Sequence, residues 1–139
     1  MTKDLKSVTE TVVKTFADFD LPMEVLRAYE GFNHFHIHLV PKKPVRMHEV
    51  SGFIEDLRFA LGCYVIKIEA PVRNKKEVKV SILKENRGGV VQWANQQSYL
   101  LEQDNVSPLT VPIGITEERE VKLIDLATLP HLLVGGRSL

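Results

Sequence analysis

The sequence predicts an α+β fold, in a single small domain whose mixed, mostly antiparallel sheet is packed by two or three helices. Three observations carry this prediction. Apolar residues recur with helical spacing in a few stretches, they alternate with polar residues in several short ones, and no repeat or linker divides the chain. A chain of 139 residues can bury its own core, and 44% hydrophobic with 26% charged residues is typical of soluble globular proteins. This composition excludes disordered, collagen-like and mucin-like chains.

Residues 3–19 are expected to form the first helix. Their apolar residues recur at spacings of three and four, which places them on one face: Leu5, Val8, Val12, Val13, Phe16 and Phe19. Asp20 and Pro22 end this pattern, because a residue that precedes proline is disfavoured in helical geometry.

Two further helices are expected, over residues 47–61 and 90–103. The apolar stripe of the first consists of Val50, Phe53, Ile54, Leu57 and Leu61. Gly62 follows it, where a left-handed C-cap residue is favoured. In the other helix the residues along one side are Val90, Ala94, Gln97 and Leu101.

Strands are expected where apolar and polar residues alternate between turn signals. The segments concerned are 24–30, 33–40, 64–70, 78–82, 109–115 and 120–126. Gly31 and Asn33 favour a turn between the first two strands. Pro112 cannot donate a ladder hydrogen bond, so its strand is expected at the edge of a sheet.

Charge is distributed unevenly although its sum is zero, with 18 basic and 18 acidic residues. Residues 41–87 hold 11 basic and 6 acidic groups, whereas residues 1–40 and 100–128 are net acidic. Two loops carry much of the excess and supply the candidate DNA-binding residues: Lys42, Lys43, Arg46, Arg73, Lys75 and Lys76. Such a block is either solvated surface or a face turned toward a polyanion or a neighbouring subunit.

Three histidines, His34, His36 and His38, alternate along the expected strand 33–40 and share one of its faces. One interpretation is a polar, solvent-exposed strand face. The other is a metal-dependent enzyme site, in which two imidazoles bind zinc and a further ligand comes from His48 or Glu49.

The lone Cys63 cannot form an internal disulfide and is expected to pack in the core, because a helix C-terminus does not lower a thiol pKa. No apolar run reaches 18 residues and no secretory signal is visible at the start. A cytoplasmic location is therefore expected. Of the aromatic residues in the basic block, Phe53 and Phe59 are expected in the core, which leaves little for stacking on bases.

The last residues form an apolar run that ends in two glycines, Leu132 to Gly136. Phosphate-binding loops begin in this way, with a buried strand followed by G-x-x-x-x-G-K-[ST]. Gly136 is the candidate first glycine of such a loop. By spacing alone this signal is weak, since many strands end in Gly-Gly.

The segment from Asp125 to Gly136 (DLATLPHLLVGG), together with Asn105 to Gly114 (NVSPLTVPIG), resembles the stretch before the Walker A loop in the FtsK/SpoIIIE family of DNA translocases. The resemblance extends upstream over Glu49 to Gly62 (EVSGFIEDLRFALG) and Val65 to Val72 (VIKIEAPV). It covers nearly the whole chain, strongly over 105–136 and loosely before that.

This resemblance implies a small α/β domain over residues 1–130, with residues 131–139 as the truncated first strand of a following RecA-like ATPase domain. It also implies double-stranded DNA as partner, a hexameric ring in the full-length protein, a process such as chromosome segregation or DNA transfer, and ATP with magnesium bound outside this chain. Many members of this family carry a membrane-spanning N-terminal part, which implies a membrane anchor in the full-length protein. The chain itself is expected to be non-catalytic and to hold no cofactor. A free-standing nucleic-acid-binding module that uses residues 41–87 is the main alternative.

Overall fold

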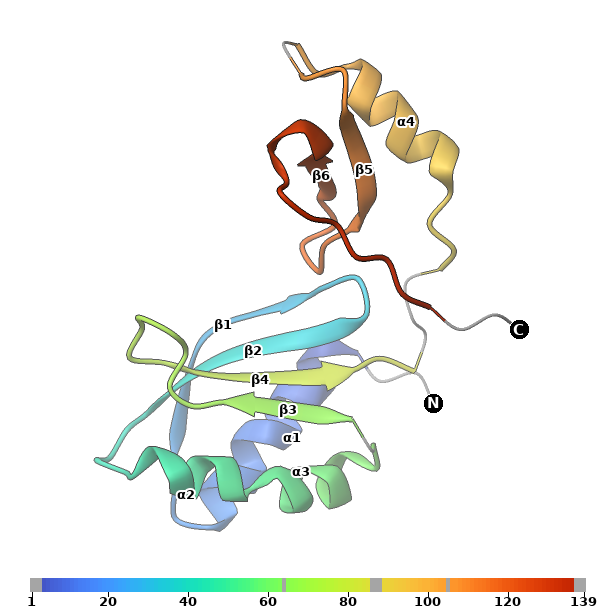
Figure 1. The fold of residues 1–139 in the computed structure, drawn as a ribbon. Coiled ribbons are helices and arrows are strands. Elements are labelled where there is room, and N and C mark those ends of the chain that lie inside the picture. Colours follow the sequence, from blue (N-terminus) through green and yellow to red (C-terminus); the bar gives the residue numbers. More distant parts are fainter. Residues whose placement is uncertain (1–3, 64, 86–88, 105, 137–139) are drawn as a thin grey trace. The chain divides into compact units, whose positions relative to one another are not determined.

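The computed structural model describes residues 4–63, 65–85, 89–104 and 106–136, and the chain falls into two compact units, residues 1–89 and 90–139 (Figure 1). Both units are built from helices and antiparallel strands, which confirms the α+β class. The predicted division at residue 130 stays a prediction. No helix in the described residues is long and apolar enough to cross a membrane.

The first unit is a four-stranded antiparallel sheet with its helices on one face (Figure 1). Its elements, in chain order, are α1 (Leu5–Asp18), β1 (Met23–Glu30), β2 (His34–Pro41), α2 (Met47–Gly52), α3 (Ile54–Leu61), β3 (Ile66–Glu69) and β4 (Val78–Leu83). The strand order is β1-β2-β4-β3, so β2 and β4 are the central pair. All six elements predicted for this part of the chain are present, one of them split in two.

The core of the first unit lies between the sheet and the helices. Strand alternation sends the apolar residues of the central strands to this side: Phe35, Ile37 and Leu39 from β2, and Val78, Val80 and Ile82 from β4. The helices contribute buried side chains of their own, namely Val8, Val12, Phe16, Val50, Leu57 and Leu61. Burial of each such side chain stabilises the fold by roughly 1.5–3 kcal/mol.

Local signals fix the ends of the helices. The Asp4 carboxylate accepts a hydrogen bond from the Ser7 backbone N–H at 2.9 Å and caps α1. Gly62 ends α3 in the predicted left-handed conformation, with φ of 57° and ψ of 39°. A side chain at this position would strain the backbone, which explains the choice of glycine.

The helix predicted over 47–61 is two helices, because Phe53 leaves helical geometry between α2 and α3. Its ring packs edge-on against Phe16 of α1, with centroids 5.4 Å apart. The expectation that Phe59 is a core residue is wrong. That side chain is 93% exposed, since it lies off the stripe that faces the core. Cys63 is partly buried and packs against the core, as predicted.

The second unit consists of helix α4 (Trp93–Leu101), strands β5 (Thr110–Ile115) and β6 (Val121–Asp125), and a 3-10 turn over Leu126–Thr128. The two strands form their own antiparallel sheet, whose register shifts between Pro112 and Gly114. Both strands are edge strands in this two-stranded sheet, in agreement with the prediction from Pro112.

Residues 131–136 form neither helix nor strand, and Leu132, Leu133 and Val134 are exposed. The sequence predicts a strand here, as the start of a following domain. A strand needs a neighbour for its backbone groups, and the described residues provide none for this segment. That assignment stays a prediction.

Candidate nucleic-acid interface

The two basic loops predicted as DNA-binding lie at the same end of the four-stranded sheet. The first follows β2 and the second precedes β4, and these strands are antiparallel partners in which Leu39 pairs with Val78. A shallow groove of about 280 Å³ joins the loops. It is lined by Pro41, Met47, Pro71, Lys75, Lys76, Glu77 and Val78. Residues more than 25 positions apart in the sequence thus contribute to one surface.

Most of the cations on this surface are unneutralised. All six candidate side chains belong to exposed residues. Lys43 pairs with Asp20 at 2.8 Å, and Lys75 lies 3.5 Å from Glu77. Within the described part of the chain, the other four, namely Lys42, Arg46, Arg73 and Lys76, form no ion pair. This end of the sheet therefore carries a local excess of positive charge on a chain whose net charge is zero.

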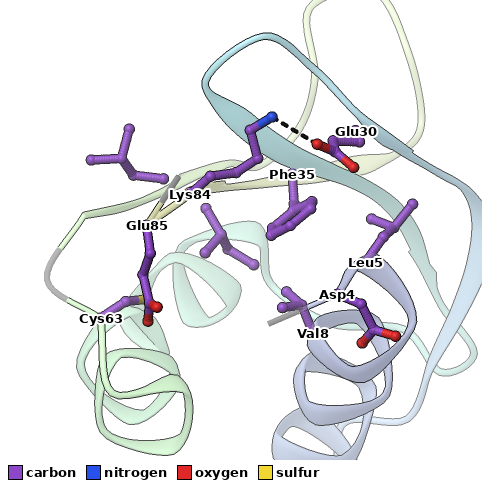
Figure 2. Close-up of a pocket in the computed structure, with 10 residues that line it drawn as sticks. Asp4, Leu5, Val8, Glu30, Phe35, Cys63, Lys84 and Glu85 are labelled. Carbon is purple, nitrogen blue, oxygen red and sulfur yellow. Dashed lines mark hydrogen bonds and ion pairs between the residues drawn. The ribbon is translucent and has the colours of Figure 1, made fainter. Parts of the chain in front are cut away.

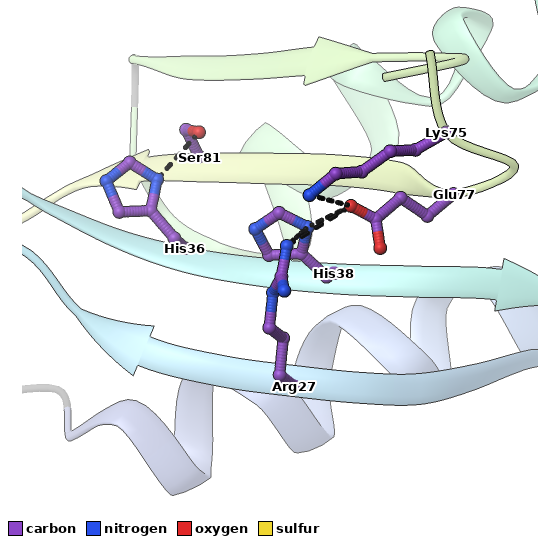
Figure 3. A network of polar contacts seen from close by, with 6 residues as sticks. All are labelled: Arg27, His36, His38, Lys75, Glu77 and Ser81. Carbon is purple, nitrogen blue, oxygen red and sulfur yellow. Dashed lines mark hydrogen bonds and ion pairs between the residues drawn. The ribbon is translucent and has the colours of Figure 1, made fainter. Parts of the chain in front are cut away.

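The buried Glu77 anchors the second loop (Figure 3). Its Oε1 accepts from His38 Nδ1–H at 3.1 Å and from the Arg27 guanidinium at 3.2 Å. Burial raises the pKa of the Glu77 carboxyl, but the hydrogen bond from His38 and the charges of Arg27 and Lys75 outweigh it, so the pKa lies below its usual range. The carboxylate stays ionised and holds the loop next to the central strands.

Burial also lowers the pKa of His38, and the nearby Arg27 acts in the same direction against the opposing pull of Glu77. His38 is therefore neutral at pH 7, with its proton on Nδ1 directed at the carboxylate. Tyr29 stacks on this ring with centroids 6.0 Å apart and lies tilted against the His36 ring at 5.0 Å. His36 Nδ1 lies 3.0 Å from the Ser81 hydroxyl (Figure 3).

These contacts correct the interpretation of the three histidines as an exposed strand face, because His36 and His38 are buried and His34 is partly exposed. His36 and His38 are each only 4% exposed, because Tyr29 and the side chains of β4 cover them. The metal interpretation also finds no support, since the described residues contain no cluster of three or more metal-ligating side chains. His48 lies exposed on α2.

A second cavity, of about 300 Å³, opens beside the start of α1 (Figure 2). The Lys84 ammonium donates to the Glu30 carboxylate at 2.8 Å and to the Gly31 carbonyl at 2.9 Å. The cavity combines apolar walls with carboxylates from Asp4, Glu30 and Glu85. Because its buried cation is already paired, this cavity adds nothing to the basic surface.

The sequence predicted the two basic loops but gave no sign of Glu77 and Arg27, whose contacts fix the loop 73–76. A carboxylate at the end of a lysine-rich loop gives no periodic signal, and only the strand register shows that Arg27 lies opposite His38. Gly136, the candidate first glycine of a phosphate loop, lies exposed in the irregular segment 131–136, and its role stays a prediction.

Several curated proteins with similar sequences are named DNA translocase FtsK. Residues 1–83 match the FtsK alpha domain. A DNA translocase FtsK of Streptococcus pyogenes serotype M3 is 30% identical over 127 residues, which cover 89% of this chain and 15% of the relative. The DNA translocase FtsK of Streptococcus pneumoniae R6 is 28% identical over 98% of this chain and 18% of the relative, and that of Helicobacter pylori J99 is 27% identical over 86% and 14%.

The chain thus spans about one sixth of the length of these curated relatives. The family match covers residues 1–83, which include the four-stranded sheet, its three helices and both basic loops. The resemblance found in the sequence is therefore confirmed, and the chain belongs to the FtsK alpha domain family.

Proposed function

We propose that this chain is a non-catalytic accessory domain of an ATP-driven translocase of double-stranded DNA. It aids the assembly of a hexameric ring and the passage of the duplex through that ring. In this proposal the domain lies in the cytoplasm. Its relatives are named DNA translocases, and the chain matches a fraction of their length. The observation that carries the role in DNA contact is the meeting of two basic loops at one end of the sheet.

Phosphates bind where a surface carries cations that can replace counterions. The loop 73–76 offers Arg73 and Lys76 without a partner among the described residues, and Lys75 only loosely paired. Glu77 fixes the end of this loop, so the loop backbone is held next to the central strands before DNA arrives. A surface of this kind recognises the backbone and reads no sequence, which suits a protein that moves along any duplex.

The chemistry of ATP hydrolysis lies outside this chain. Phosphoryl transfer in such enzymes needs a Gly-Lys-Ser/Thr loop to hold the phosphates and magnesium. The sequence contains no Gly-Lys pair, and Gly136 is at most the first glycine of that loop. ATP and magnesium belong to the larger protein in this proposal.

Anisotropy of a labelled duplex tests the proposal, with the 139-residue protein titrated at several salt concentrations. We expect weak binding that falls steeply as salt rises. The double variant Lys75→Glu/Lys76→Glu should abolish measurable binding, or reduce the slope of log K against log salt by roughly 2 where binding remains. The matched control, Lys6→Glu/Lys14→Glu, reverses two exposed charges on α1 and should bind like the wild type.

Equal affinity of the loop variant and the wild type would refute the assignment of this surface. Binding by a protein that stays monomeric at every concentration, with no ring in the longer protein, would favour the free-standing module instead.

A further inference from the structure

The loop between β3 and β4 is closed by its own backbone hydrogen bonds. The Val72 N–H donates to the Glu77 carbonyl at 2.8 Å and closes the base of the loop. The Lys75 N–H donates to the Val72 carbonyl at 2.9 Å and forms a β-turn with Arg73 and Asn74 at its centre. The basic residues of this loop are therefore attached to a short, closed backbone.

Asn74 adopts a left-handed backbone conformation at the third position of this turn, with φ of 61°. Type II β-turns require a positive φ at that position, which glycine and asparagine reach most easily. A β-branched residue there would strain the backbone, because its Cβ approaches the following carbonyl oxygen. The path of the chain from Arg73 to Lys75 thus depends on the residue at position 74.

The tip of the loop offers hydrogen-bond donors that the described part of the chain does not use. Arg73 and Lys76 are exposed and form no ion pair there. Among the same described residues, no acceptor binds the backbone N–H groups of Arg73, Asn74 and Lys76. Backbone amides and cationic side chains are the groups that bind phosphate oxygens in protein–DNA complexes. The tip therefore combines two kinds of phosphate donor.

The acidic side chains of this hairpin do not cancel its positive charge. Residues 69–79 hold four basic and two acidic side chains. Glu77 is buried and faces Arg27 and Lys75. Glu69 lies opposite Lys79 in the strand register, within the paired part of the hairpin. The remaining excess of positive charge fits a polyanion as the ligand.

We propose that Asn74 is the positioning residue of the DNA contact, and that its turn binds one phosphodiester group through the backbone amides and the side chains of Arg73 and Lys76. This inference rests on the proposed function and names the chemical group that the loop recognises. A positioned set of donors loses less conformational entropy on binding than a flexible cationic segment does. Affinity therefore depends on the backbone conformation at position 74 as well as on the charge of the loop.

The variant Asn74→Val tests this dependence, because it leaves every charge in place. We expect its affinity for a labelled duplex, measured by anisotropy with the 139-residue protein, to fall about tenfold. The slope of log K against log salt should fall by roughly 1, as one phosphate contact is lost. Asn74→Gly keeps the left-handed conformation and should bind within about twofold of the wild type. The matched control, Asn95→Val, makes the same substitution at an exposed position of α4 and should change neither quantity.

Two outcomes of this comparison would overturn the inference. Equal affinity of Asn74→Val and the wild type would show that the conformation at position 74 does not matter. A loss in Asn74→Gly as large as that in Asn74→Val would show that the asparagine side chain itself makes the contact. Thermal unfolding of the variants separates a local effect from a loss of the fold, and the Tm of Asn74→Val should stay within about 5 °C of the wild type.

Amide resonances of the wild type provide a measurement that needs no variant. In an NMR titration with a short duplex, the amides of Arg73, Asn74 and Lys76 should shift more than those of Lys6 and Lys14, which are exposed on α1. A duplex that binds without moving the three loop amides would overturn the backbone contact.

The double variant Lys75→Glu/Lys76→Glu distinguishes failure of this inference from failure of the proposed function. Loss of binding in that variant, together with normal binding by Asn74→Val, would leave the DNA role of the loop in place and overturn the positioning role of Asn74. A wild-type protein that binds no duplex in either assay would refute both.

Discussion

The Nδ1 atom of His38 lies 3.1 Å from Oε1 of Glu77, so a buried donor on β2 meets a buried carboxylate immediately before β4. Strand pairing places these residues 39 positions apart in the sequence but at neighbouring sites in the sheet. Arg27 from β1 joins the same oxygen at 3.2 Å. One carboxylate thus links the two central strands and an edge strand next to the basic loop 73–76.

Replacement of Glu77 by glutamine is expected to destabilise the first unit. The amide keeps the shape of the side chain but removes the negative charge that Arg27 and Lys75 face. Thermal unfolding should show a clear fall in Tm, and DNA affinity should fall with it, since the loop loses its anchor. Asp20→Asn breaks an exposed pair with Lys43 and is the matched control, with no change in Tm expected. Equal Tm values for the two variants would contradict an anchoring role.

Stability should fall as pH drops below neutrality, and His38 should account for part of this fall. Its pKa in the folded state lies below the ordinary value of about 6.5, so the unfolded chain binds more protons over that interval. The free energy of unfolding therefore decreases as pH falls from about 6.5 toward the lowered pKa. Glu77 extends the loss at lower pH, because its pKa is also lowered and its protonation favours the unfolded chain.

Urea denaturation at a series of pH values between 7.5 and about 5 measures this dependence. The variant His38→Gln should show a shallower decline over that range. His48→Gln, which changes an exposed histidine on α2, should keep the wild-type slope. Identical slopes for all three proteins would exclude His38 as the titrating group.

The sequence predicted the first unit well because its patterns are local. The alternation of apolar and polar residues in 33–40 and the helical spacing of apolar residues in 3–19 both predict which face is buried. Gly62 predicts the left-handed residue that ends α3. Periodicity could not indicate which side chains cover the face of the sheet opposite the helices. The burial of His36 depends on Tyr29 from another strand, and no pattern within 33–40 contains that information.

The second unit was harder to predict for a related physical reason. Gln96 is buried while Val90 and Leu101, placed on the predicted helix face, are exposed. Sequence periodicity assumes that the apolar residues of a helix face a core within its own unit, and α4 does not meet that assumption. The candidate DNA-binding lysines were easier to find, since charge excess is a property of composition.

Two residues of α3 should respond in opposite ways to truncation. Leu57 is fully buried, so Leu57→Ala should lower the free energy of unfolding by about 2–5 kcal/mol. Phe59 is 93% exposed, so Phe59→Ala should change it by no more than about 0.5 kcal/mol. Chemical denaturation of both variants measures the difference. A large loss in Phe59→Ala would show that this side chain is covered in solution.

Removal of residues 131–139 should leave the stability of the rest nearly unchanged. Leu132, Leu133 and Val134 are 57%, 95% and 84% exposed, and the described part of the segment belongs to no helix or strand. Side chains that remain in water contribute little to folding, so the shift in Tm should stay within about 2 °C. Any dimer that forms through this apolar segment should dissociate on its removal. A fall in Tm of many degrees would instead place the segment in the core of the second unit, and the prediction that it begins a following ATPase domain would lose its support.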